Sequence, residues 1–175
     1  MLSVRTIRTA NLLALGLILG GCGQSRNSAP SLVATDSLTN IATVIEVIDG
    51  DTVDLSIDGH RQRVRLIGVD TPETKHPNKP AQCFGHEATV FTESLLAQDT
   101  KVRLERDTEA RDTYDRLLVY LYRNFDNMFI NLELVRQGFA RVLIIEPNVA
   151  YMDRFVTAAR DARVNNRGLW HACRG

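Results

Sequence analysis

The sequence lacks two features that would each point to a particular class of protein. It carries no net charge, because 21 Lys and Arg residues balance 21 Asp and Glu residues over 175 positions. A protein that packages nucleic acid through bulk positive charge is therefore excluded, and any contact with a polyanion must depend on a local basic cluster or a metal ion. Aromatic residues make up only 6% of the chain, which argues against a long base-stacking surface.

Long hydrophobic runs are also lacking. The one marked run, residues 12–19, follows Arg5 and Arg8 and is too short to cross a bilayer, so we predict an export signal over residues 1–21. The signal ends in Gly-Gly-Cys, which resembles the lipobox of bacterial lipoproteins. We expect Cys22 to carry a lipid that anchors an exported protein to a membrane, facing the periplasm or the cell exterior. An ordinary signal peptide followed by an incidental Cys is the alternative.

The segment after the signal has the composition of a linker. Residues 22–40 are rich in Ser, Asn, Ala, Thr and Pro, and only Arg26 and Asp36 are charged. This composition favours a flexible tether over packed structure. A single folded domain is then expected over residues 41–175.

Cysteine is scarce in that domain, which contains only Cys83 and Cys173. In an oxidising compartment the two can form one disulfide, which would join the end of the chain to the start of the first helix. Two free thiols are the alternative. A zinc site fits less well, because neither Cys has a second Cys or His at zinc-like spacing apart from His171 beside Cys173.

Residues 41–69 have the pattern of strands. Runs of β-branched residues are interrupted at Asp49-Gly50 and at Asp58-Gly59, two dipeptides that favour tight turns, so we predict a three-stranded meander. In the third strand, alternation places Arg61, Arg63 and Arg65 on one face.

Further strands and helices alternate after the meander. We expect helices over residues 87–97, 130–137 and between Pro147 and Gly168, and strands over residues 101–105, 117–122 and 140–145. In this order, strands come first and helices are interspersed among the later strands. The order indicates a small α+β domain built around a five-stranded barrel.

Acidic residues gather in two short segments, residues 49–52 and 65–73. If the strand ends meet, four carboxylates come together, those of Asp49, Asp51, Asp70 and Glu73. Like charges at close range raise one another's pKa unless a cation or arginines neutralise them, so the cluster suggests a metal site. Oxygen ligands favour Ca²⁺ or Mg²⁺ over zinc. Taken separately, each segment is better explained as a plain turn or loop.

Four ordered motifs resemble the staphylococcal nuclease family. They are residues 47–53, 65–77, 114–116 and 131–138, and the likeness extends from Val47 to Trp170. The resemblance implies an OB-type barrel with three α-helices. It also implies calcium-dependent hydrolysis of phosphodiester bonds in DNA and RNA, with products that carry a 3′-phosphate. We expect a monomer without a protein partner.

The resemblance assigns roles to particular acidic residues. Asp51 and Asp70 would bind Ca²⁺ through their carboxylates, and Thr71 would bind it through its main-chain carbonyl. A site with so few protein ligands is open to substrate but holds its ion weakly. Glu73 falls at the position of the candidate general base, where it would orient or deprotonate the attacking water.

Arg65 and Arg116 match the two catalytic arginines of the family, and Tyr114 matches a residue that contacts the nucleotide. Attack on a phosphodiester adds negative charge at phosphorus, which planar guanidinium donors can meet. Three alternatives stay open, and the first is that Tyr114 is a tyrosine at the edge of the core. Arg65 can be a solvated charge on the strand face, and Arg116 can pair with a nearby acid, either Asp112 or Asp115.

The chain departs from the family pattern near the second arginine. Asp115 stands where the family usually has Gly, Thr113 replaces a usual Lys, and residues 142–145 lack the tyrosines of the nucleotide pocket. A positive φ at Asp115 would strain its main chain. Two rival classes remain. One is a catalytically inactive OB-type lipoprotein that binds nucleic acid or protein, and the other is a structural lipoprotein whose carboxylates bind calcium only for stability.

Overall fold

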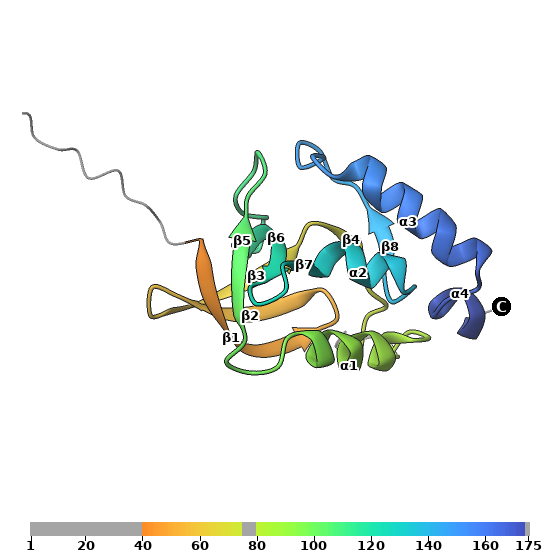
Figure 1. Ribbon diagram of the computed structural model, residues 1–175, viewed down its shortest axis with the longest axis horizontal. Coiled ribbons are helices and arrows are strands. Elements are labelled where there is room, and N and C mark those ends of the chain that lie inside the picture. The colour runs from red at the N-terminus through yellow and green to blue at the C-terminus, as the bar shows by residue number, and fades with distance from the viewer. Residues whose placement is uncertain (1–39, 75–79, 174–175) are drawn as a thin grey trace, which may run out of the picture. The chain divides into compact units, whose positions relative to one another are not determined.

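An antiparallel meander opens the described part of the chain. Its strands are β1 (Ile41–Asp49), β2 (Thr52–Ile57) and β3 (His60–Leu66), joined by turns at the two Asp-Gly dipeptides. This computed structural model describes residues 40–74 and 80–173 (Figure 1). The predicted signal, the predicted lipid anchor Cys22 and all but the last residue of the predicted tether lie outside these ranges.

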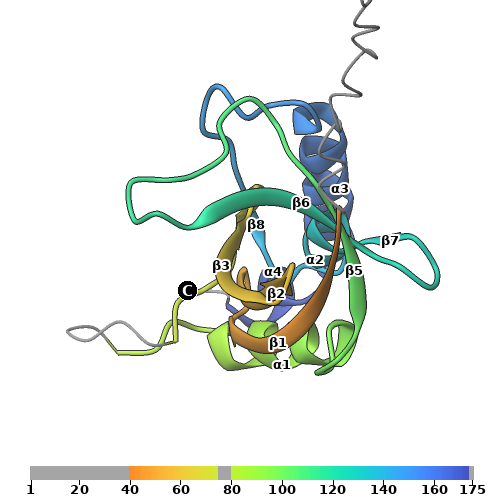
Figure 2. The same cartoon turned by 90° about the vertical axis from the view of Figure 1, so that its left-hand side faces the viewer.

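Two longer connections bring later strands back to close a barrel. β5 (Lys101–Glu105) pairs antiparallel with β1, and β6 (Leu117–Arg123) pairs antiparallel with β5. β6 also pairs in parallel with β3, so the five strands curve around one interior (Figure 2). The predicted five-stranded barrel is confirmed, and the short β7 (Met128–Phe129) extends its edge.

A second, two-stranded sheet lies next to the barrel. β4 (Gly68–Asp70) follows β3 almost directly and pairs antiparallel with β8 (Arg141–Leu143). β8 is the core of the strand predicted over residues 140–145, and the pairing sets Asp70 opposite Arg141.

Helices cover the barrel from outside. α1 (Gly85–Leu95), α2 (Ile130–Arg136) and α3 (Met152–Val164) confirm the three predicted helices, and a four-residue helix, α4 (Leu169–Ala172), follows them. α2 lies between the barrel and α3 (Figure 1). Within the described ranges, we find no helix with the length and apolar character needed to cross a bilayer.

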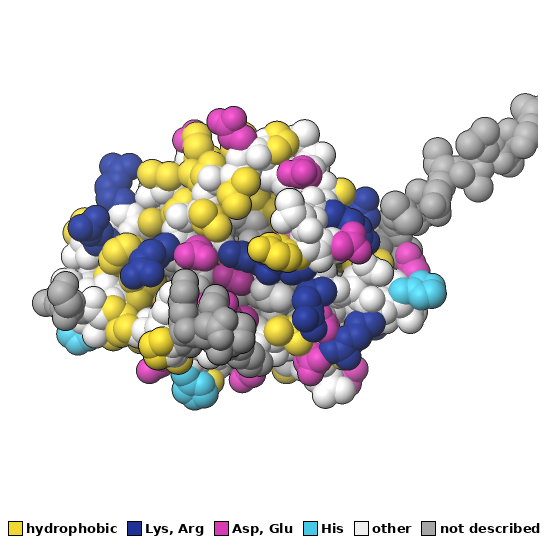
Figure 3. All heavy atoms as spheres, turned by 180° about the vertical axis from the view of Figure 1, so that it is seen from behind, with side chains coloured by type: hydrophobic (Ala, Val, Ile, Leu, Met, Phe, Trp, Pro, Cys, Tyr) yellow, Lys and Arg dark blue, Asp and Glu magenta, His cyan; other side chains and the backbone are white. Residues whose placement is uncertain are grey.

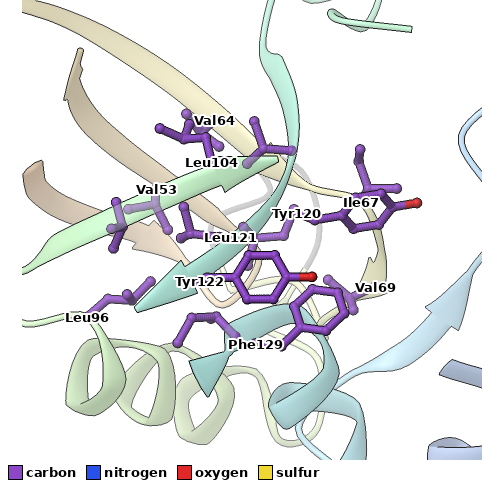
Figure 4. Close-up of a cluster of buried hydrophobic side chains, with 14 of the residues drawn as sticks. Val53, Val64, Ile67, Val69, Leu96, Leu104, Tyr120, Leu121, Tyr122 and Phe129 are labelled. Atoms are coloured by element: carbon purple, nitrogen blue, oxygen red, sulfur yellow. The ribbon is translucent and has the colours of Figure 1, made fainter. Parts of the chain in front are cut away.

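The barrel interior is filled by aliphatic side chains. Alternate residues of β2 and β3 point inward, and Val53, Leu55 and Val64 are fully buried with Leu121 of β6 (Figure 4). Burial of one such side chain contributes about 1.5–3 kcal/mol to folding. An aromatic cluster extends this core toward α3, where the Tyr120 ring lies 6.3 Å from that of Phe155.

The arginine-rich face of β3 is neutralised by acids from its neighbours. Asp54 of β2 is buried, and its carboxylate accepts hydrogen bonds from Arg61 Nε at 2.8 Å and from Arg63 Nε at 2.8 Å. Glu46 of β1 pairs with Arg61 as well. Arg61 and Arg63 therefore stabilise the strand pairing and do not form an unopposed basic patch.

The ion pairs of Asp54 predict how stability depends on pH. Hydrogen bonds from Arg63 and then Arg61 lower the pKa of Asp54 below its ordinary value, despite its burial. A carboxylate with a lowered folded-state pKa stabilises the fold above the unfolded-state pKa, and this contribution is lost as the pH falls through the folded-state pKa. We expect Asp54→Asn to lower the free energy of unfolding by about 2 kcal/mol at neutral pH and by less near pH 3.

Urea denaturation of the wild type and of Asp54→Asn at both pH values measures this difference. Asp99→Asn serves as the control, because Asp99 is exposed and Asn tolerates its positive φ. A destabilisation of equal size at both pH values would contradict the assignment.

A disulfide closes the domain. Cys83, just before α1, is bonded to Cys173 at the end of α4, with a Cα–Cα distance of 5.9 Å and a sequence separation of 90 residues. Cross-linking so long a loop restricts the unfolded chain. We therefore expect Cys83→Ser with Cys173→Ser to lower the free energy of unfolding by about 4 kcal/mol, measured by urea denaturation. An unchanged unfolding midpoint would show that the bridge does not form in solution.

Candidate active site

The two acidic segments meet through Asp51 and Thr71, which are 20 residues apart in sequence. Asp51 Oδ2 accepts hydrogen bonds from the Thr71 main-chain N–H at 2.9 Å and from Thr71 Oγ1 at 3.0 Å. Thr52 Oγ1 donates to Asp51 Oδ1 at 3.1 Å. The turn can approach this closely because position 50 is Gly: a Cβ there would lie 2.8 Å from Thr71 Cγ2. The carboxylate of Asp51 is thus fixed against the loop that follows β4.

Arg65 lies between the carboxylates of Asp51 and Asp70. Its Nη1 donates to the main-chain carbonyls of Leu66 at 2.8 Å and Val69 at 2.7 Å. Its Nη2 lies 3.1 Å from Asp51 Oδ2 and 3.6 Å from Asp70 Oδ1. The side chain is only 12% exposed. The alternative that Arg65 is a solvated strand-face charge is therefore wrong, in contrast to Arg63, which is 51% exposed.

Asp51 and Asp70 form a pair of like charges. Burial, followed by the charge of Asp51, raises the pKa of Asp70, and the charges of Arg65 and Arg141 only partly offset this effect. A cation near both groups would relieve the remaining repulsion, and a set of oxygen donors suits a hard divalent ion. The residues present therefore fit a metal of this kind, with Thr71 as a further oxygen donor. Over residues 40–74 and 80–173, no group of three or more His, Cys, Asp and Glu side chains is arranged to hold a metal.

The prediction that all four carboxylates gather in one cluster needs correction, because they separate into two pairs. Asp49 Oδ1 accepts hydrogen bonds from the Gly50 N–H at 2.9 Å, from Thr89 Oγ1 at 3.0 Å and from Thr74 Oγ1 at 3.2 Å. Burial raises the pKa of Asp49, and a hydrogen bond and the charge of Glu73 add to that rise. Asp49 therefore anchors loops beside Glu73 and does not join Asp51 and Asp70.

Two threonines of α1 hold the turn that carries Asp51. Thr89 binds Asp49 as described above, and Thr92 Oγ1 donates to the Gly50 carbonyl at 2.7 Å. Both threonines are buried. Sequence reasoning missed them, although polar residues at i and i+3 within the apolar stripe of a helix are a usable signal, since a buried hydroxyl needs a partner.

Arg116 stands immediately before β6 and is oriented by Asp112. Asp112 Oδ2 accepts from Arg116 Nε at 2.7 Å, and Asp112 Oδ1 accepts from the Arg116 N–H at 2.9 Å. Of the two acids that the sequence offered as partners, Asp112 is the one found. Asp115 instead lies 3.5 Å from Arg111, and its φ of 62° confirms the expected left-handed main chain. Tyr114 is 80% exposed, with its ring centre 5.4 Å from the Arg116 guanidinium carbon.

Both arginines line one cavity of about 280 Å³ between β4, β8 and the segment before β6. Ile67, Leu118, Leu143 and Ile145 provide an apolar wall. Asp51 and Asp70 do not line the cavity but contact Arg65, which connects it to the acidic pair. One face of the domain shows basic and acidic side chains interleaved across its middle, below a hydrophobic area (Figure 3).

Comparison with known proteins agrees with this geometry. The profile of the family described as "Staphylococcal nuclease homologue" matches residues 63–172. The chain is 43% identical to a thermonuclease of Staphylococcus hyicus over 127 residues, and the aligned region covers 73% of each chain. It is 42% identical over 137 residues to a thermonuclease of Staphylococcus intermedius, covering 78% of this chain and 80% of the relative. It is also 37% identical to the endonuclease YncB of Bacillus subtilis, over 76% of this chain and 62% of the relative.

Together, the barrel, the paired acids and the two arginines define an enzyme of the nuclease class, which hydrolyses phosphodiester bonds of nucleic acid. The chain belongs to the staphylococcal nuclease family. Members of this family generally depend on a metal ion.

The close approach at Gly50 yields a prediction. Gly50→Ala adds a methyl group 2.8 Å from the Thr71 side chain and must displace either Thr71 or Asp51. A displacement of this kind lowers the rate of an enzyme by about 10²-fold when it moves a site residue by about 1 Å. Steady-state nuclease assays test this expectation. Gly59→Ala is the control, because it adds strain at a φ of 79° but meets no atom within 4 Å. Equal activity of the two variants would contradict the proposed packing.

Proposed function

We propose that this protein is a calcium-dependent endonuclease that cleaves DNA and RNA to products with 3′-phosphates. One observation carries the proposal: the Arg65 guanidinium touches both acidic residues of the pair and lines the same cavity as Arg116. An electrophilic phosphate in that cavity would meet two guanidinium groups next to a metal-binding pair. The names of the thermonuclease and endonuclease relatives support the same activity.

Asp51 and Asp70 would hold Ca²⁺ through their carboxylates, and Thr71 would hold it through its main-chain carbonyl. Bound calcium supplies positive charge that polarises the phosphate and favours ionisation of a nearby water. Asp51 is preorganised for this role, because Thr71 and Thr52 fix both of its oxygens. Asp70 is half exposed, which leaves it accessible to an ion from solvent.

The arginines stabilise the charge that develops on the phosphate. Attack at phosphorus adds negative charge to its oxygens, and preorganised donors aimed at that charge lower the barrier. Two main-chain carbonyls hold Arg65 in place, so it needs little reorganisation when the substrate binds. Asp112 takes the Nε donor of Arg116, so a phosphate in the cavity would be met by the terminal Nη groups.

Glu73 is the proposed general base. It follows Thr71 by two residues in the same loop, and a general base at this position would orient or deprotonate the attacking water. Asp49, with its raised pKa, lies beside it. On the other side of the site, the exposed Tyr114 would contact the nucleotide, and the aliphatic wall would accept a base by apolar contact instead of aromatic stacking.

The proposed setting is outside the cytoplasm. We retain the expectation of an export signal over residues 1–21, a lipid on Cys22 and a tether over residues 22–40, which together would leave a monomeric nuclease domain attached to a membrane. The bond between Cys83 and Cys173 supports an oxidising compartment, because disulfides persist there.

Single substitutions of the two arginines test the proposed activity. With plasmid DNA and RNA substrates in millimolar calcium, we expect Arg65→Ala and Arg116→Ala each to lower kcat by about 10²-fold to 10³-fold, because each removes a preorganised donor. Chelation of calcium should abolish cleavage.

Two matched controls are available on the same surfaces. Arg63→Ala removes a neighbouring strand-face arginine that contacts Asp54, and Arg111→Ala removes an arginine that lies outside the cavity lining. Both should keep near-normal rates. Digestion products should accept a label at their 3′ ends only after a phosphatase removes the 3′-phosphate. Cleavage that survives chelation, or wild-type rates for Arg65→Ala, would overturn the proposal.

A further inference from the structure

Gln82 contacts the main chain of Glu73 in both directions. The Gln82 N–H donates to the Glu73 carbonyl at 2.9 Å, and the Glu73 N–H donates to Gln82 Oε1 at 3.2 Å. These are the two hydrogen bonds that a neighbouring strand would make. Glu73 lies three residues beyond the end of β4, where the pairing of β4 with β8 has ended. Gln82 thus takes the place of a strand partner for the proposed general base.

Gln82 is itself held by the start of α1. Its carbonyl accepts a hydrogen bond from the Gly85 N–H at 3.1 Å, which ties it to the first residue of α1. Gly85 packs directly against the Glu73 loop: a Cβ there would lie 2.7 Å from Thr74 Cγ2 and 2.8 Å from the Pro72 carbonyl oxygen. The loop therefore lies against the start of a helix that is fixed to the barrel through Thr92.

The disulfide fixes the same segment to the C-terminal part of the domain. Cys83 directly follows Gln82, and its partner Cys173 ends α4. α4 in turn begins on the turn after α2, where the Leu169 N–H donates to the Gly138 carbonyl at 2.8 Å. The main chain around Gln82 is thereby cross-linked to a part of the fold that does not otherwise contribute to the site.

We propose that Gln82 is a positioning residue for Glu73, and that the bond between Cys83 and Cys173 holds Gln82 in register. This inference rests on the proposed role of Glu73 as the base. A catalytic side chain must be held to within about 0.5 Å of its productive position. The Cys83–Cys173 disulfide then has a part in catalysis in addition to stability.

Kinetics of two Gln82 variants test the proposal. Gln82→Met keeps the length of the side chain but removes the acceptor for the Glu73 N–H, and we expect kcat to fall about 10-fold with little change in KM, as a misplaced general base would give. Gln82→Glu retains an acceptor oxygen and should restore most of the lost rate. Gln82 is exposed, so neither change disturbs the core. His86→Ala, at another exposed position nearby, is the control and should leave kcat unchanged.

A double-mutant cycle with Glu73→Gln separates positioning from a general loss of structure. If Gln82 acts through Glu73, Gln82→Met should cause no further loss of kcat once Glu73→Gln is present. The Cys83→Ser, Cys173→Ser variant, assayed at a temperature where circular dichroism shows it folded, should lose kcat in the same non-additive way.

The outcomes distinguish this inference from the proposed function. An active Glu73→Gln enzyme would remove the role of Glu73 and the inference with it. An impaired Glu73→Gln enzyme together with a wild-type kcat for Gln82→Met would overturn the positioning role alone. The positioning role would also be overturned if the kcat losses of the two single variants multiplied in the double variant, because Gln82 would then act independently of Glu73.

Discussion

The site depends on the position of one guanidinium group. Arg65 lies on β3, which pairs with β2 on one side and β6 on the other, with Arg65 opposite Thr52 and Leu118. The β2 side brings Asp51 to Arg65, and the β6 side brings Arg116 to the same cavity. Closure of the barrel through the parallel β3–β6 pairing therefore determines whether the acidic pair and the second arginine can act together. An open sheet of the same strands would separate them.

Charge balance decides the role of each acidic residue around this centre. Asp54 neutralises Arg61 and Arg63, so those arginines stabilise the outer face of the barrel. Asp112 orients Arg116 through a short ion pair. Asp51 and Asp70 share Arg65 as a close arginine, and burial, followed by the charge of Asp51, still raises the pKa of Asp70. A chain without net charge thus keeps, within the part that the structure describes, a small region in which a cation is favoured.

Local sequence patterns predicted the features that local geometry decides. The Asp-Gly turns, the strand alternation that places three arginines on one face, and the three helices were all predictable, because each depends on residues close in sequence. The separation of Asp49 from Asp51 and Asp70 was not predictable from sequence, since it depends on a hydrogen bond with Thr89, 40 residues away. Nor could the sequence choose between Asp112 and Asp115, because the left-handed main chain at Asp115 turns that side chain toward Arg111. The contacts of Gln82 could not be predicted either, because they arise from tertiary packing and leave no periodic pattern in the sequence.

The proposed mechanism requires a metal ion and two arginines to act on one phosphate. A crystal structure of the protein with Ca²⁺ and an uncleavable phosphorothioate dinucleotide tests it most directly. We expect one ion bound by Asp51 and Asp70, with Arg65 and Arg116 both donating to the same phosphate group. A complex in which Arg116 contacts only Asp112, and the phosphate lies away from Arg65, would contradict it.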